Sequence, residues 1–391
     1  MVRYGVIGIG NMGSAHARAL YEGRVSGAEL TCVADIEDNK LKWAKENLSP
    51  EVSLYNDYES LISSGLVDAV LIATPHYLHP VIAKRSFEKG INVLSEKPSG
   101  VDASDVKEMN EAAKRSGKAF GIMFNQRTNM LFRMLKYYIS IGMLGDIKRF
   151  NWIINNWYRT QAYYESSSWR ASWNGEGGGV LLNQCPHNID IWQWIMGMPD
   201  KIMAFCNEGH FHNIAVEDDV TIYAQYRNGA TATFITSTGE YPGTNRLEIS
   251  GTMGKAVAED GKLKLSLLNT DERTICFKSE KAMPTEPVSE IVICPEDEED
   301  GHVMILKNFT EHILNKAPLI APGEEGINSL TISNAAYLSS WTKSEVNIDY
   351  DKELFTKLLS EKKMQEKMTE KNSKGLVEIM GDYNKRWSVN W

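Results

Sequence analysis

Two side chains in this sequence have acid–base chemistry and stand in unusual local contexts. Lys97 lies in Glu96-Lys97-Pro98, directly after the apolar run 91–95, and His187 follows the glycine-rich segment 175–179. A histidine, with an unperturbed pKa near ~6.5, can take a proton from a hydroxyl group at neutral pH. A lysine can stabilise the resulting alkoxide or relay its proton. The pair suits the oxidation of a secondary alcohol if a hydride acceptor binds nearby.

The sequence also allows interpretations of Lys97 and His187 that involve no catalysis. Lys97 and Glu96 would form a surface ion pair if both were exposed, and His187 would be a satisfied histidine at a helix start. Pro98 favours a cleft for Lys97, because a residue before proline is held extended and its ammonium group is thereby aimed.

The hydride acceptor is indicated at the N-terminus by Gly8-x-Gly10-x-x-Gly13, which an apolar run precedes and a helix-compatible segment follows. In this strand–turn–helix context Gly8 allows the tight turn, Gly10 the approach of a pyrophosphate, and Gly13 the packing of helix on strand. Asn11 and Met12 in this motif are predicted cofactor contacts, and N–H groups at the start of the following helix would hold the pyrophosphate. Asp35 follows the second apolar run, where a carboxylate accepts from a ribose 2′-hydroxyl and repels a 2′-phosphate. The motif therefore predicts NAD rather than NADP; an ordinary glycine-rich turn is the alternative.

Further cofactor contacts are expected beyond the carboxyl ends of the other strands, where ligands of parallel sheets bind. A loop histidine and a helix-start residue are the alternatives for the two histidines in this set. The predicted contacts are Thr74, Pro75, His76, His79, Glu96, Lys97, Gln126, Trp169 and Arg170.

Amides, an arginine and aromatic rings in the middle of the chain suit a polyhydroxylated ring, which has apolar C–H faces and a polar rim. Core packing is the alternative for each aromatic ring. The predicted substrate contacts are Asn125, Trp157, Tyr158, Arg170 and Asn183, with Trp169 and Trp173 as further flat faces. A helix over 179–196 would place Asn183, His187 and Asp190 on one face, and Pro186 would either start it or kink it.

A metal site is the competing chemistry. His210-x-His212 would place two imidazoles on one side of a strand, with Glu208 and Glu217 nearby in sequence. Third and fourth ligands at recognisable spacing do not follow, so we expect an exposed hairpin and no metal.

The elements that position these residues fall into two patterns. Strands near 3–9, 29–35, 67–73 and 91–95 alternate with helices near 14–22, 38–47, 57–64, 79–89 and 102–116, which predicts an α/β Rossmann domain, a doubly wound parallel sheet, over 1–122. From 147 long alternating segments, the last at 273–278, predict an α+β domain with a large open antiparallel sheet over 123–350. Residues 351–391 predict a helical extension and a polar tail, whose Trp387 and Trp391 suggest docking.

The composition bounds the class of protein. A net charge of -9 argues against a nucleic-acid partner, and the apolar stretches are too short to span a bilayer. The first strand begins at once, which leaves no room for a signal peptide. Five scattered cysteines without a C-x-x-C pair suit reduced thiols in the cytoplasm.

Together these motifs resemble the glucose-fructose oxidoreductase / inositol dehydrogenase / MocA family over about residues 1–350. The residues that carry the resemblance are the glycine motif, Ala73-Thr74-Pro75 with His79, Glu96-Lys97-Pro98, Gly177-Gly178-Gly179 with His187 and Asp190, and Gly323-Glu324-Glu325-Gly326. The resemblance implies tightly held NAD(H) or NADP(H), catalytic Lys97 and His187, and a homodimer or homotetramer packed through the open sheet. The family usually has aspartate at the position of Asn183. An amide cannot hold Lys97 charged or relay a proton, so proton transfer would depend on His187.

The resulting hypothesis is an NAD-dependent oxidoreductase acting on a secondary hydroxyl of a sugar, glycoside or cyclitol. A first alternative is redox-neutral cleavage of a glycoside, in which bound NAD oxidises the substrate transiently. A second is a non-catalytic NAD-binding sensor, which the pairing of Lys97 with His187 disfavours.

Overall fold

The first part of the chain forms a six-stranded parallel sheet with the strand order β3-β2-β1-β4-β5-β6. The structure is a computed structural model that describes residues 1–167, 169–297 and 299–366. The strands are β1 (Val2–Ile7), β2 (Ala28–Ala34), β3 (Ser53–Tyr55), β4 (Ala69–Ile72), β5 (Asn92–Ser95) and β6 (Phe120–Ile122). The order reverses between β1 and β4, so the predicted doubly wound sheet is confirmed. The sequence missed β3, because three residues are too few to show a period.

Helices cover both faces of this sheet and supply its two apolar layers. One face packs against α1 (Asn11–Tyr21), α2 (Asp38–Asn47) and α10 (Gly301–Asn315), and the other against α3 (Tyr58–Ser63), α4 (Leu78–Glu88) and α5 (Ala103–Ser116). α10 comes from far downstream, yet Thr310 in it shares a 2.8 Å hydrogen bond with the Tyr4 hydroxyl of β1. The chain therefore returns to the first sheet after building the second.

The second sheet has nine strands in the order β14-β13-β12-β11-β7-β10-β9-β8-β15. Its strands are β7 (Ile147–Ile154), β8 (Lys201–Glu208), β9 (Glu217–Gln225), β10 (Thr231–Ser237), β11 (Asn245–Gly251), β12 (Gly254–Glu259), β13 (Lys262–Leu268), β14 (Val288–Ile293) and β15 (Val346–Asn347). β7 and β10 run parallel, so the sheet is mixed and mostly antiparallel rather than wholly antiparallel.

The predicted strand 273–278 is wrong, because this segment is the helix α9 (Glu272–Lys278) and the edge strand is β14. A short apolar run fits either element by its period alone. The side chain of Asp271 accepts from the Arg273 N–H and so caps a helix start, which decides the outcome.

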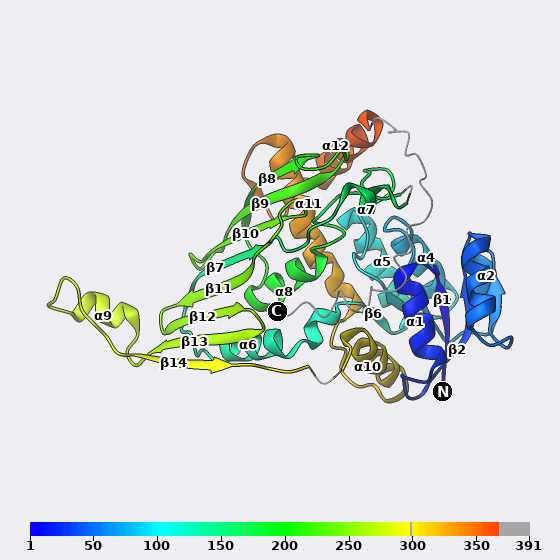
Figure 1. The fold of residues 1–391 in the computed structure, drawn as a ribbon, viewed down its shortest axis with the longest axis horizontal. Helices are drawn as coiled ribbons and strands as arrows, with labels where there is room; N and C mark the ends of the chain where they lie inside the picture. The colour runs from blue at the N-terminus through cyan, green and yellow to red at the C-terminus, as the bar shows by residue number, and fades with distance from the viewer. Residues whose placement is uncertain (168, 298, 367–391) are drawn as a thin grey trace.

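Three helices cover one face of the large sheet and lie between it and the first sheet (Figure 1). They are α6 (Met130–Ser140), α8 (Pro186–Met196) and α11 (Gly326–Thr342). The ring of Trp192 in α8 stacks between Phe150 and Phe234 of the sheet at centroid distances of 5.8 and 5.9 Å. The other face is open, and Phe205 on it is 59% exposed.

The C-terminal extension begins with α12 (Lys352–Gln365), as predicted. Trp387 and Trp391, for which we predicted docking, lie outside the described residues. Over the described part of the chain, none of the helices has both the length and the apolar character that a bilayer crossing requires.

Candidate active site

A buried ion-pair network joins the carboxyl edge of the first sheet to helix α8. Arg127 lies in the turn η1 (Asn125–Thr128) that follows β6. Its guanidinium donates two hydrogen bonds of 2.7 and 2.8 Å to Asp190 and a third of 2.5 Å to Glu325. The side chains of Arg127 and Asp190 are each 1% exposed. This contact holds α8, and with it His187, against the strand ends.

His187 is the second residue of α8, which begins at Pro186. The proline therefore starts the helix, and the predicted helix over 179–196 is wrong, because the ring at 186 suits a first helical position. The imidazole is buried, with the Phe124 ring at a centroid distance of 6.3 Å. Burial and the positive charge of Lys97 hold the pKa of His187 well below its ordinary value. The ring is therefore neutral at pH 7 and able to accept a proton.

Lys97 follows β5 and points toward the segment before α8. Its ammonium donates a 2.9 Å hydrogen bond to the backbone oxygen of Asn183. Burial lowers the pKa of Lys97, and the nearby charge of Arg170 adds to this, whereas Glu96 and Glu176 oppose it. Lys97 thus lies near enough to His187 for its charge to act on the ring, although no single helix face carries Asn183 and His187.

The loop between β7 and α8 brings several predicted substrate residues together. Asn183 donates through its side-chain nitrogen to Glu176, and the hydroxyl of Tyr163 accepts a 2.8 Å hydrogen bond from Arg170. The Arg170 guanidinium also lies 4.8 Å from the Trp169 ring, and the Trp169 ring lies 5.7 Å from that of His76. The sequence singled out Asn183, Arg170 and Trp169 but missed Glu176 and Tyr163.

Other predicted aromatic contacts are not brought to Lys97. Trp173 is buried and packs edge-on against Tyr337 and Trp341, so it belongs to the core. Trp157 is also buried in that core, whereas Tyr158 is 43% exposed beside Tyr241. Trp157 and Trp173 thus both pack in the core, and a contact of Trp157 with substrate stays a prediction.

The glycine loop at the N-terminus of α1 fits a dinucleotide. A Cβ at Gly13 would lie 1.7 Å from the Gly8 oxygen, so this contact requires glycine. A Cβ at Gly10 would meet nothing within 4 Å, which leaves open space above the loop. Gly10 is the N-cap and provides no side-chain hydrogen bond, so the N–H groups that open α1, at Asn11 and Met12, face that space.

Buried polar atoms around this space also fit a nucleotide. Thr74 Oγ1, Asn125 Oδ1 and Gln126 Oε1 are buried and have no hydrogen-bond partner within the described chain. Hydroxyl and carboxamide groups of NAD would satisfy such atoms, which are otherwise costly to bury. The residues present therefore fit the predicted cofactor.

Asp35 and His79, two further cofactor candidates, form hydrogen bonds with other parts of the protein. Asp35 accepts backbone hydrogen bonds from Ile9 at 2.6 Å and Glu37 at 2.9 Å, which leaves each oxygen one lone pair for a ribose. The ring nitrogens of His79 contact the oxygens of Pro98 and Thr74, both at 2.7 Å, and so tie two strand ends together.

Glu96 lies 2.7 Å from the buried ring nitrogen of His16, and Nδ1 of His76 lies 2.8 Å from the oxygen of Glu176. Pro75 starts a turn in which its backbone oxygen accepts a hydrogen bond from the N–H of Leu78. These side chains shape the strand ends, and their contact with a nucleotide stays a prediction.

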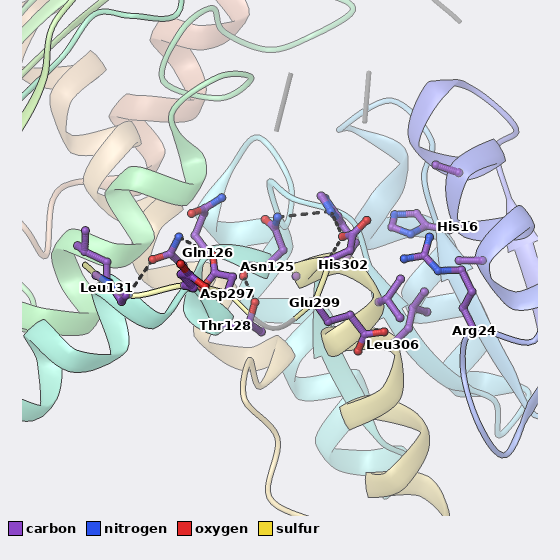
Figure 2. Close-up of a pocket in the computed structure, with 18 of the residues that line it drawn as sticks. His16, Arg24, Asn125, Gln126, Thr128, Leu131, Asp297, Glu299, His302 and Leu306 are labelled. Carbon is purple, nitrogen blue, oxygen red and sulfur yellow. Dashed lines mark hydrogen bonds and ion pairs between the residues drawn. The ribbon is translucent and has the colours of Figure 1, made fainter. Parts of the chain in front are cut away.

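A cavity of about 940 Å³ opens beside the glycine helix (Figure 2). Met12, Asn125 and Gln126 line it, together with His16 of α1 and His302 of α10, which the sequence did not single out. The rings of His16 and His302 lie 5.7 Å apart, and Asn125 contacts His302 at 3.4 Å. The cavity shares Met12, Asn125 and Gln126 with the predicted cofactor and substrate residues, although Lys97 and His187 do not line it.

The two histidines of the competing metal hypothesis face carboxylates. Nδ1 of His212 lies 2.8 Å from Asp218 and Nδ1 of His210 lies 3.0 Å from Asp219. The side chain of His212 is only 7% exposed, so the predicted exposed hairpin is wrong at this residue. Glu217 points elsewhere and accepts from the N–H groups of Gly179 and Leu181.

Comparison with known proteins identifies the class. Residues 2–124 match the family model of the NAD-binding Rossmann fold of an oxidoreductase family, and residues 136–348 match that family's C-terminal alpha/beta domain. The chain belongs to this NAD-binding oxidoreductase family, which includes the MocA protein, as the sequence motifs predicted.

Individual relatives resemble the chain more distantly. A myo-inositol 2-dehydrogenase of Thermotoga maritima is 24% identical over 358 residues, which cover 89% of this chain and 99% of the relative. A 2,7-anhydro-N-acetylneuraminate hydratase of Escherichia coli is 32% identical over 212 residues, 52% of each chain.

The structure of the WlbA dehydrogenase of Chromobacterium violaceum in complex with NADH and UDP-GlcNAcA superposes with a TM-score of 0.75. That alignment has 26% identity and covers 90% of this chain and 96% of the other.

Proposed function

We propose that this protein transfers hydride between a secondary hydroxyl of a sugar, glycoside or cyclitol and NAD. The observation that carries the proposal is that the Lys97 ammonium lies near enough to the buried, neutral His187 for its charge to act on the ring, at the edge of the sheet that bears the glycine loop. An acid–base pair beside a dinucleotide site is what alcohol oxidation requires.

In this proposal each residue has one task. His187 takes the hydroxyl proton on its neutral ring, and Lys97 stabilises the developing oxyanion. Asn125, Arg170 and Asn183 bind hydroxyl groups of the substrate. Bound NAD⁺ supplies the acceptor for hydride. The cofactor is held by the glycine loop, Asp35 and the ends of β4, β5 and β6.

The substrate class is supported by two relatives. One carries the name myo-inositol 2-dehydrogenase, and another is bound to NADH and a nucleotide sugar. The polar loop around Arg170 and Asn183, beside the Trp169 ring, is also suited to hydroxyl groups on a ring.

Redox-neutral turnover with retained NAD is the second candidate. It is favoured by the relative of 32% identity, which is named a hydratase and not a dehydrogenase. The purified protein with NAD⁺ would be offered monosaccharides, glycosides and cyclitols while NADH absorbance and product masses are recorded.

Stoichiometric NADH with a product two hydrogens lighter is expected. Cleavage or hydration without NADH would replace the main proposal by the second candidate. Cofactor binding without any product would favour the sensor.

We further propose a cytoplasmic homodimer or homotetramer that packs through the open face of the large sheet. In the described part of the chain all five cysteines are free thiols. The open face carries apolar side chains on β7, β8 and β9, namely Ile153 at 37%, Phe205 at 59% and Tyr223 at 42% exposure. Light scattering would give the mass, and Phe205→Lys is expected to yield monomers.

A further inference from the structure

Glu176 connects three segments that carry predicted site residues. One carboxylate oxygen accepts from the side-chain nitrogen of Asn183, and the other accepts a 2.7 Å hydrogen bond from the N–H of Ala171. The backbone oxygen of Glu176 contacts Nδ1 of His76 at 2.8 Å. The side chain is 2% exposed, and Arg170 Nη1 lies 3.8 Å from Oε1. A carboxylate buried to this degree is retained only with such partners.

The contact with Glu176 also fixes the orientation of Asn183. A carboxylate only accepts hydrogen bonds, so the amide must present its nitrogen to Glu176 and its oxygen to the other side. On that side Gln184 donates to Oδ1 at 3.2 Å and the Tyr163 hydroxyl lies at 3.5 Å. The backbone oxygen of the same Asn183 accepts from the Lys97 ammonium.

The charges that face Lys97 come from several elements. Arg170 adds a second positive charge, whereas Glu96 and Glu176 are negative. Glu96 is engaged by His16 at 2.7 Å. Burial raises the pKa of Cys185 to about 12, so that thiol is uncharged.

Two buried histidines near Lys97 are also uncharged. Burial and neighbouring positive charges hold the pKa values of His76 and His187 well below the ordinary value. Both carboxylates that act on Lys97 as named above are shared with another group, Glu96 with His16 and Glu176 with Arg170.

We propose that Glu176 is a positioning residue of the active site, whose carboxylate holds the Asn183 oxygen toward hydroxyl donors and places a negative charge behind the backbone contact between Asn183 and Lys97. This deepens the proposed function and rests on it for the identity of the site. Asn183 and Glu176 act as one unit, in which the backbone oxygen of Asn183 accepts from Lys97 and its side-chain nitrogen donates to Glu176. The carboxylate of Glu176 thereby supplies the negative charge that Asn183 lacks relative to the aspartate usual in the family.

The test measures the reactivity of Lys97 and needs no substrate. The full-length protein is acetylated with acetic anhydride from pH 6 to 10, and mass spectrometry gives the rate at Lys97 relative to a free reference amine. The variants are Glu176→Gln, Asn183→Asp and the double change. Glu165→Gln, an exposed glutamate nearby in the same loop, is the matched control.

For Glu176→Gln we expect the rate at pH 7 to rise about tenfold, because a lost negative charge lowers the pKa of Lys97 by about one unit. Returning a carboxylate in Glu176→Gln/Asn183→Asp should bring the rate to within about threefold of the wild type. Asn183→Asp alone puts two carboxylates in contact and should lower the melting temperature below that of the double variant.

An unchanged rate in Glu176→Gln would overturn the proposal, and so would a double variant that reacts like the single one. If Glu176→Gln fails to fold, the double variant still decides, since it keeps one carboxylate beside Lys97. A substrate panel without any product would overturn the proposed function and leave the acetylation rates valid.

Discussion

The cofactor edge, which is the glycine loop and the strand ends proposed to bind NAD, and the substrate loop, which is the segment 155–185 proposed to bind substrate, are built by different means. At the cofactor edge the shape comes mainly from the backbone, because parallel strands end together and three glycines bring the start of α1 close to them. In the loop between β7 and α8 the shape comes from side chains, chiefly Glu176, Arg170 and Tyr163. A backbone scaffold tolerates changes of side chain that a polar network does not.

The substrate loop has a second support in the C-terminal extension. The carboxylate of Glu366, just after α12, accepts from the N–H groups of Trp173 at 3.0 Å and Asn174 at 3.1 Å. The ammonium of Lys363 lies 3.9 Å from the centre of the Tyr77 ring. These contacts lie beyond the 136–348 segment that matches the family, so the extension holds a loop that the family domains also contain.

The largest effect is expected where the two regions are joined. Arg127→Met leaves Asp190 buried without its main partner, which typically costs about 3–5 kcal/mol of unfolding free energy. Chemical denaturation measures this loss. Arg127→Met/Asp190→Asn removes the buried charge as well and should recover part of it; a double variant less stable than the single one would contradict the role of the ion pair.

Removal of the ammonium separates catalysis from cofactor binding. Lys97→Met should lower kcat/KM on the best alcohol of the panel by about a hundredfold or more, whereas the Kd of NADH stays within about threefold. Stopped assays and NADH fluorescence give the two numbers. Lys89→Met, an exposed lysine, is the control, and full activity in Lys97→Met would exclude this lysine from the chemistry.

Variants of two glycines separate an effect on the stability of the cofactor edge from an effect on NADH binding. Gly10→Ala adds a methyl group to open space, so the melting temperature should hold while the NADH affinity falls about tenfold through contact with the pyrophosphate. The methyl group added in Gly13→Ala collides with the Gly8 backbone, so this variant should lower both the melting temperature and the NADH affinity. Unchanged NADH affinity in Gly10→Ala would place the nucleotide elsewhere.

The smallest effect is expected from the extension. Glu366→Gln weakens two charge-assisted hydrogen bonds at a partly exposed site, so KM should rise about threefold with little change in kcat or stability. Glu353→Gln, an exposed glutamate in α12, is the control. A change in kcat instead of KM would show that the extension acts on the chemistry.

The contrast between the two regions also sets what the sequence could predict. Apolar runs that alternate with helical patterns located most strands and helices of the first sheet but not β3, and Lys97 and His187 were singled out by their local context. Periodicity could not tell α9 from a strand or find the start of α8 at Pro186.

Long-range side-chain partners left no local signal. Arg127 and Asp190 are 63 positions apart, and Glu176 lies within a glycine-rich run that has no periodicity to indicate burial. Its contact with Asn183 exists only once the loop has folded. A buried carboxylate of this kind is visible in the structure alone.

The most direct test of the account follows one hydrogen atom. The protein would be given NAD⁺ and its best alcohol with deuterium on the carbinol carbon, and the cofactor and product would be weighed by mass spectrometry. Hydride transfer at the joint of the two regions predicts NADH one mass unit heavier and a ketone without deuterium. Unlabelled cofactor beside a hydrated or cleaved product that retains deuterium would contradict net oxidation by this site.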